Sequence, residues 1–295
     1  MNRVREALHA TEIHRAGITG RGITAAVLDT GICRHPDYSE RIVAFRDFVN
    51  GKPSCYDDAS HGTHVAGILG GSGKSSGGKY CGIAPGCRIV SGKVLDGFGA
   101  GEVENLIRAI EWVVEQRDVY RIRILNISAG TTRTEEDRQA RELLRCVERA
   151  WNDGLVVIVA AGNLGPGPES ITIPGNCRKV ITVGAFDHYS GCGPTSECIC
   201  KPELVAPGTR ISSCYSGFRR GVYYTRKSGT SMAAPAVAGA VALLLEQEPE
   251  LTNVEVKMRL KEAAVDTGMP KNCQGWGMPD LRRLLLWHAD GKRYI

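Results

Sequence analysis

The sequence has no uninterrupted apolar run long enough to cross a membrane. Its longest stretch without a charged or strongly polar residue, 232–245, has fourteen residues and includes Pro235, whereas a membrane-spanning helix needs about 18 or more. The N-terminus, Met1-Asn2-Arg3, is not followed by the apolar segment typical of a secretory signal peptide. We therefore expect neither a membrane span nor a signal peptide.

A strong charge of one sign is also lacking. The chain has 37 Lys and Arg against 32 Asp and Glu, a net charge of +5. Basic clusters at 117–123 and 219–227 are interrupted by apolar residues, which favours ordinary solvated surface over an acidic partner. Because no nucleic-acid-binding motif accompanies them, we expect no nucleic-acid partner.

The composition is that of a folded domain. Hydrophobic residues make up 42% and charged residues 23% of the 295 residues, which excludes a disordered chain, and no Gly-X-Y or heptad repeat indicates a fibre. The length suffices for a large α/β domain. We expect residues 1–295 to form a single domain.

Cysteine is plentiful, but its number is odd. Eleven cysteines leave at least one thiol unpaired in a monomer. Together with the missing signal peptide, this favours free thiols in a reducing cytoplasm over a disulfide scaffold. Cys192, Cys198 and Cys200 are spaced by six and two residues, unlike the paired CxxC of a zinc site. Metal binding or redox control by these cysteines stays the alternative.

Short apolar runs alternate with longer amphipathic ones. Apolar and β-branched runs predict buried strands at 23–28, 88–94, 122–127, 155–160 and 180–183. Helical spacing of apolar residues predicts helices at 103–116 and 135–152. This alternation indicates an α/β fold with a mainly parallel central sheet and helices on both faces. In such folds the chemistry lies beyond the carboxyl ends of the strands.

Four chemically distinct side chains occur at these strand–helix boundaries. Asp29 ends the first strand, His61 opens an apolar helix, Asn163 follows the strand at 155–160, and Ser231 precedes a strongly apolar helix. Singly, each is more typical of a cap or a turn. A metal pair of His61 with the histidine three residues later is disfavoured, because the Glu of an HExxH site is missing.

Together, the four residue types have the chemistry of nucleophilic catalysis. Serine is a weak nucleophile until a base such as imidazole takes its proton, and a carboxylate must hold that imidazole in place. A side-chain amide and the free N–H groups at a helix start stabilise a developing oxyanion. The order Asp29, His61, Asn163, Ser231 on one parallel sheet therefore predicts acyl transfer.

These motifs resemble the subtilisin-like serine proteases (subtilases, peptidase family S8), in particular intracellular bacterial members. VLDTGI, HGTHVAG, NISAG, AAGN, VAPG and SGTSMAAP follow the family's order between about residues 20 and 246. The resemblance implies a subtilisin-like three-layer fold and a serine endopeptidase. It assigns Asp29 as orienting acid, His61 as general base, Ser231 as nucleophile and Asn163 as oxyanion donor.

The resemblance also implies where a peptide or protein substrate binds. Gly99, Ala100 and Gly101 would form one edge that pairs with the extended substrate backbone, and Ser128, Ala129 and Gly130 would form the opposite edge. Leu164 and Thr172 would border the pocket for the side chain before the cut. Ordinary glycine turns are the alternative. No acidic residue is evident near these positions, so we expect a preference for apolar or medium-sized side chains.

Many subtilases hold structural Ca²⁺, and Asp37 matches one ligand position. The loop that would complete the site, 70–82, contains no carboxylate, although Ca²⁺ usually takes several oxygen ligands that include carboxylates. We therefore expect no cofactor or metal for catalysis and do not favour a structural Ca²⁺. Only 28 residues precede Asp29, so no propeptide is evident. This favours a cytoplasmic enzyme over a secreted one trimmed to its mature form.

Several alternatives stay open. The apolar segment 281–287 is expected to dock on the domain, with a homodimer contact as the alternative. In place of a general endopeptidase, the chain could be a catalytically silent subtilase-fold regulator or scaffold. It could also be a maturation protease dedicated to one peptide, or an esterase or peptide ligase. Thiol control through Cys33 or Cys214 is a further hypothesis.

Overall fold

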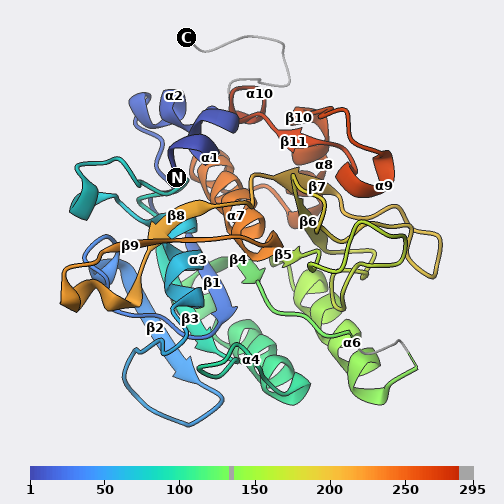
Figure 1. Cartoon of the computed structure of the whole chain (residues 1–295), viewed down its shortest axis with the longest axis horizontal. Helices are drawn as coiled ribbons and strands as arrows, with labels where there is room; N and C mark the ends of the chain where they lie inside the picture. Colours follow the sequence, from blue (N-terminus) through green and yellow to red (C-terminus); the bar gives the residue numbers. More distant parts are fainter. Residues whose placement is uncertain (133–135, 286–295) are drawn as a thin grey trace.

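The computed structural model describes residues 1–132 and 136–285, with the backbone alone at 219–220. Its centre is a seven-stranded parallel sheet in the order β2-β3-β1-β4-β5-β6-β7 (Figure 1). The strands are β1 (Thr24–Asp29), β2 (Ile42–Asp47), β3 (Arg88–Lys93), β4 (Ile122–Ile127), β5 (Val156–Ala160), β6 (Ile181–Ala185) and β7 (Leu204–Ala206). β1 is buried along its whole length, as a parallel sheet covered by helices requires.

Two pairs of helices pack on this sheet. α3 (His61–Gly70) contacts α7 (Thr230–Gln247), and α4 (Val103–Glu115) contacts α6 (Arg138–Asn152). The fold is the mainly parallel α/β arrangement that the sequence predicts. The other α-helices and strands of the described residues are α1 (Asn2–Ala7), α2 (Ala10–Arg15), α5 (Arg117–Tyr120), β8 (Ile211–Cys214), β9 (Tyr224–Lys227), α8 (Asn253–Ala263), β10 (Ala264–Val265), α9 (Lys271–Gln274), β11 (Met278–Pro279) and α10 (Leu281–Leu285).

The five predicted strands are present as β1, β3, β4, β5 and β6. The helices predicted at 103–116 and 135–152 are α4 and α6, and the apolar helices predicted at His61 and after Ser231 are α3 and α7. α6 begins at Arg138, later than predicted, because the Asp137 side chain caps it by accepting hydrogen bonds from the N–H groups of Gln139 (2.8 Å) and Ala140 (3.2 Å). The prediction omits the two edge strands. β2 is only half buried and β7 has three residues, so neither stands out as an apolar run.

α7 crosses the middle of the molecule (Figure 1). Among the described residues it is the helix long and apolar enough to span a membrane, yet 83% of it is buried within the domain. Its small and aliphatic residues let it pack against β4, β5 and β6. The apolar composition of α7 is therefore that of a core helix.

The C-terminal helix α10 docks on the domain. Leu281 and Leu284 are fully buried, and the Leu281 N–H donates a 3.1 Å hydrogen bond to the carbonyl oxygen of Leu8. These leucines are therefore unavailable for a dimer contact. Residues 286 and 287 of the predicted segment lie outside the described residues, and a homodimer stays a prediction.

The expectation of free thiols alone is wrong for one pair. Cys192 and Cys273 form a disulfide with their Cα atoms 4.5 Å apart, joining the segment after β6 to α9. The other nine cysteines form no disulfide within the part of the chain that the structure describes. An 81-residue separation shows no spacing motif, so the sequence alone could not predict this pairing.

Candidate active site

Asp29 and His61 meet at the carboxyl end of β1. The Asp29 carboxylate is buried, and its Oδ1 lies 2.7 Å from Nδ1 of His61, the first residue of α3. This contact needs a glycine at position 62. A Cβ there would lie 2.1 Å from the carbonyl oxygen of Gly31 and 3.1 Å from Cβ of Asp29. Gly62 therefore lets the start of α3 approach the end of β1 closely.

Asp57 holds the first turn of α3 in place. Its Oδ1 accepts hydrogen bonds from Thr30 Oγ1 and from the N–H of Ser60, and its Oδ2 accepts one from the N–H of Thr63, each of 2.8 Å. Thr30 Oγ1 in turn accepts a 2.9 Å bond from the N–H of Gly62. The sequence does not predict this role of Asp57. The polar residues just before a catalytic-type histidine were the available signal.

The two histidines of α3 have different environments. Burial lowers the pKa of His61, but the charge of Asp29 and the hydrogen bond to it outweigh burial and leave the pKa raised above 6.5. His64 is fully buried, and burial lowers its pKa to about 3. Its Nε2 lies 2.9 Å from the carbonyl oxygen of Ile211. His64 is thus a neutral core residue, and His61 is the candidate base.

Ser231 lies in the first turn of α7. Its hydroxyl donates a 3.2 Å hydrogen bond to the carbonyl oxygen of Ser128, so the predicted nucleophile contacts the predicted substrate edge. Gly229, the residue before α7, has φ +146°, a conformation that L side chains rarely adopt. The glycine in Ser-Gly-Thr-Ser therefore sets the direction in which α7 starts.

Asn163 follows β5 and turns its side chain toward the start of α7. Its Oδ1 accepts hydrogen bonds from the N–H (2.9 Å) and the Oγ1 (3.2 Å) of Thr230. Both donors use the oxygen, so the amide nitrogen is left to donate to a bound group. The predicted amide donor and the predicted nucleophile are therefore brought to the same helix start.

The first predicted substrate edge is an exposed loop after β3. It begins beside the acid, because the N–H of Val94 donates a 2.8 Å hydrogen bond to the backbone oxygen of Asp29. Gly99, Ala100 and Gly101 are exposed. The Asp96 side chain shapes the loop by accepting a 3.0 Å hydrogen bond from the N–H of Ala100. A loop of this kind leaves backbone groups open at the rim of the site.

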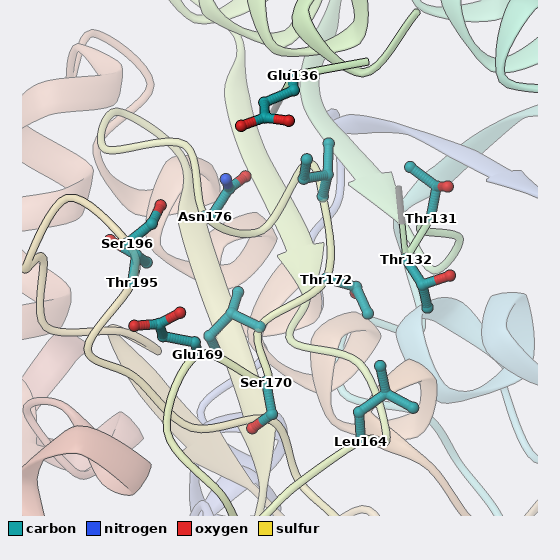
Figure 2. A pocket seen from close by; sticks show the side chains of 12 residues that line it. Thr131, Thr132, Glu136, Leu164, Glu169, Ser170, Thr172, Asn176, Thr195 and Ser196 are labelled. Carbon is teal, nitrogen blue, oxygen red and sulfur yellow. The ribbon is translucent and has the colours of Figure 1, made fainter. Parts of the chain in front are cut away.

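The second predicted edge is followed in the chain by Thr131 and Thr132, which line a pocket (Figure 2). Ser128 is buried, Ala129 is half-buried and Gly130 is exposed. Thr172 packs against this edge from behind. A Cβ atom on Gly130 would lie 2.8 Å from Oγ1 of Thr172, and a Cβ atom on Gly162 would lie 2.6 Å from the same oxygen. Thr172 and Leu164 both line this pocket, and their contact with a substrate stays a prediction.

The pocket has a volume of about 510 Å³, and its lining differs from the expectation in one respect. Glu136 and Glu169 belong to its walls. The sequence does not predict these acids at the pocket, although Glu136 follows Gly130 by six residues and Glu169 precedes Thr172 by three, because loops have no regular spacing that shows where a side chain lies. The expected preference for apolar substrate side chains assumes that no acidic residue lies near these positions, and Glu136 and Glu169 contradict that assumption at this pocket.

Both carboxylate oxygens of Asp37 accept hydrogen bonds. Its Oδ1 accepts a 3.0 Å bond from the N–H of Ser75, and its Oδ2 accepts bonds from the N–H of Gly73 (3.1 Å) and the hydroxyl of Tyr224 (2.8 Å). His35, Asp37 and Cys214 are buried, and each offers one potential metal-ligand atom within 4.8 Å of the others. The carboxylate thus serves as acceptor for the loop that follows α3.

The chain belongs to the subtilase family, whose family model (peptidase S8) matches residues 20–277. Among curated proteins, "Serine protease AprX" of Bacillus subtilis (strain 168) is 43% identical over 87% of this chain. The chain spans 64% of the length of that relative. "Subtilisin Savinase" of Lederbergia lenta is 35% identical over 92% of this chain and 93% of its own length.

Solved structures of the family share the fold. A psychrophilic protease named S41 superposes with a TM-score of 0.78 at 31% identity, covering 89% of this chain and 92% of that one. A cold adapted subtilisin-like serine proteinase gives a TM-score of 0.73 at 30% identity, covering 89% and 88%. The resemblance stated from the motifs is confirmed at the level of family and fold.

Proposed function

We propose that the chain is a serine endopeptidase that cleaves peptide bonds through an acyl-enzyme. The observation that carries the proposal is the 2.7 Å pair of Asp29 and His61, on the sheet edge where Asn163 also follows a strand. Ser231, at the start of α7, is joined to Asn163 through Thr230. The relatives named as serine proteases support the same activity.

In the proposed mechanism, Asp29 accepts the Nδ1–H of His61 and so leaves Nε2 as the basic nitrogen. His61 takes the proton of Ser231 as Oγ attacks the carbonyl carbon, and then gives it to the leaving amine. Asn163 Nδ2 and the N–H groups at the start of α7 stabilise the oxyanion. Water hydrolyses the acyl-enzyme by the same route. These groups supply the base, the acid and the oxyanion donors, so we propose that catalysis uses no metal.

Before substrate binds, the Ser231 hydroxyl is engaged with the Ser128 carbonyl oxygen. We infer that a substrate N–H takes this carbonyl when the peptide pairs with residues 128–130. Ser231 is then released to turn toward His61, in line with catalytic hydrogen bonds that form only in the substrate complex. Substrate pairing and nucleophile activation would thus be coupled.

Fluorophosphonate labelling followed by intact-protein mass spectrometry tests the activity. We expect one adduct on the wild-type protein, none on Ser231→Ala, and much slower labelling of His61→Ala. A folded wild-type protein that takes no adduct would contradict the proposal and favour the silent regulator. Labelling together with hydrolysis of a single peptide, but not of unfolded proteins, would favour the dedicated maturation protease.

The compartment is a separate proposal. The cytoplasmic prediction has no direct support from the relatives, one of which is named "Minor extracellular protease Epr". The Cys192–Cys273 disulfide fits an oxidising compartment, so we favour the secreted alternative. Thiol-blocked mass spectrometry of protein taken from cells and from medium measures both the location and the state of this pair.

A further inference from the structure

The loop that carries Asn163 lies against residues 187–192, here called the support segment, which follow β6. The carbonyl oxygen of Gly162 accepts a 2.9 Å hydrogen bond from the N–H of Gly191. The N–H of Gly165 donates a 3.0 Å hydrogen bond to the carbonyl oxygen of Tyr189. Both bonds lie within two residues of Asn163, so they hold the backbone of the oxyanion donor from either side.

Close packing couples the support segment to this loop. A Cβ atom on Gly165 would overlap the carbonyl oxygen of Ser190, so the two backbones are in direct contact. Cys192 continues the pairing, since its N–H donates a 2.9 Å hydrogen bond to Oγ of Ser170 and its carbonyl oxygen accepts a 3.1 Å bond from the N–H of the same serine. In a close-packed interior, a displacement of the support segment is therefore transmitted to the loop of Asn163.

The support segment also contacts the residues that lead into α7. The hydroxyl of Tyr189 donates a 2.8 Å hydrogen bond to Oγ1 of Thr209, because the Thr209 hydroxyl itself donates a 2.5 Å bond to the Asp187 carboxylate. The carbonyl oxygen of Gly208 accepts a 3.0 Å bond from the N–H of Gly229, the residue before α7. One short segment thus supports both the amide donor and the helix start that carries the candidate nucleophile.

Cys192 anchors the end of the support segment outside the site. Its disulfide to Cys273 joins the segment to α9, and the N–H of Gly193 donates a 2.8 Å hydrogen bond to a backbone oxygen of the same helix. The chain just after α9 is in turn held to β7, because the N–H of Val205 donates a 3.0 Å bond to the carbonyl oxygen of Gly277. The disulfide is therefore a covalent link from the sheet edge at β7 to the support of Asn163.

We propose that the Cys192–Cys273 disulfide is a positioning element for catalysis, which holds Asn163 where the oxyanion forms and whose reduction lowers kcat. The inference rests on the proposed endopeptidase activity. A dithiol such as dithiothreitol breaks the S–S bond by thiol–disulfide exchange, leaving two thiols on the protein and the reductant as a cyclic disulfide. The support segment then keeps only noncovalent contacts. Because Asn163 acts on the charge of the transition state, its displacement lowers kcat and leaves KM nearly unchanged.

The test measures kcat and KM with one p-nitroanilide peptide, well below the melting temperature. It compares the oxidised protein, the protein reduced with dithiothreitol, and the double variant Cys192→Ser/Cys273→Ser. We expect reduction or the double variant to lower kcat about tenfold, less than the loss of about 10²- to 10³-fold for removing an oxyanion donor altogether. The midpoint of the pH–rate profile should not move, because the pair of Asp29 and His61 is untouched.

Two controls separate this effect from other thiols. Dithiothreitol should not change the double variant further, since its two target sulfurs are absent. Cys198→Ser should behave as the wild type, because Cys198 is exposed on the loop after Cys192 and forms no disulfide among the described residues. Circular dichroism of the reduced wild type shows that it remains folded under the conditions of the assay.

Combination with Asn163→Ala separates a positioning role from general loosening. If the disulfide acts through Asn163, its removal lowers kcat in the wild-type background and not in the Asn163→Ala background. An equal fall in both backgrounds, or an unchanged kcat on reduction, would overturn the inference alone. So would a purified protein in which thiol-blocked mass spectrometry finds this pair reduced. A wild type that takes no fluorophosphonate and cleaves no peptide would overturn the endopeptidase proposal, and the inference with it.

Discussion

Replacing Asp57 by asparagine tests how far the candidate base depends on a residue outside the proposed triad. Asp57 is 5% exposed, and its Oδ1 accepts hydrogen bonds from Thr30, Ala59 and Ser60. Its Oδ2 accepts the N–H of Thr63, two residues after His61. The carboxylate therefore joins the end of β1 to the first turn of α3.

Asparagine has one acceptor oxygen, so Asp57→Asn cannot satisfy both sides. If the oxygen keeps the partners of Oδ1, the new NH₂ group faces the N–H of Thr63 and leaves a buried donor unpaired. Such a loss costs about 1–3 kcal/mol. The first turn of α3 then relaxes away from β1, and a misplacement of His61 by about 1 Å lowers kcat by about 100-fold.

Two measurements check this. Urea denaturation in the Ser231→Ala background, where self-digestion is excluded, gives the change in the free energy of unfolding. Peptide hydrolysis well below the melting temperature gives kcat. Asp118→Asn is the control, because the Asp118 side chain is 85% exposed and its loss should change stability by less than about 0.5 kcal/mol. If Asp57→Asn matches this control in both measurements, the positioning role is refuted.

Four further predictions concern single features. The pKa of His61 is raised above 6.5 and the neutral imidazole is the base, so kcat/KM should rise with pH and reach half its plateau above pH 6.5. In pH–rate profiles, Asp29→Asn should lower the pH of this midpoint and should lower kcat by about 10⁴-fold. Asn163→Ala should lower kcat about 10²- to 10³-fold with little change in KM, as steady-state kinetics would show. Cys192→Ser should lower the free energy of unfolding by about 2–4 kcal/mol, and reduction of the wild type should do the same in urea titrations. A chelator should leave the melting temperature of the protein unchanged if the Asp37 loop holds no Ca²⁺. Asp37→Asn should lower the melting temperature, because the Asp37 carboxylate accepts hydrogen bonds from Gly73, Ser75 and Tyr224. Calorimetry of both proteins with and without chelator measures the two effects.

The parts of the fold that the sequence predicts are those with a local signal. β1 and β5 are continuous apolar runs, and α4 has apolar residues at helical spacing. The four candidate catalytic residues are predictable because each lies at the end or the start of a strand or helix with such a signal. What the sequence hides depends on long-range packing. Glu136 and Glu169 reach one pocket only through loop folding, and the Cys192–Cys273 pair spans 81 residues.

The hydrogen bond from Ser231 to Ser128 gives the free site a built-in dependence on substrate. The Ser128 carbonyl oxygen holds the hydroxyl at 3.2 Å, and the same oxygen is the acceptor that the second edge would offer to a peptide N–H. A ligand that lacks this N–H does not compete for the Ser128 carbonyl oxygen, so we expect it to react with Ser231 more slowly than a peptide-like ligand does. A peptide that supplies it frees the nucleophile at the moment its carbonyl reaches Asn163. Backbone pairing therefore contributes to kcat as well as to binding, which is the expected outcome when binding energy is used at the transition state.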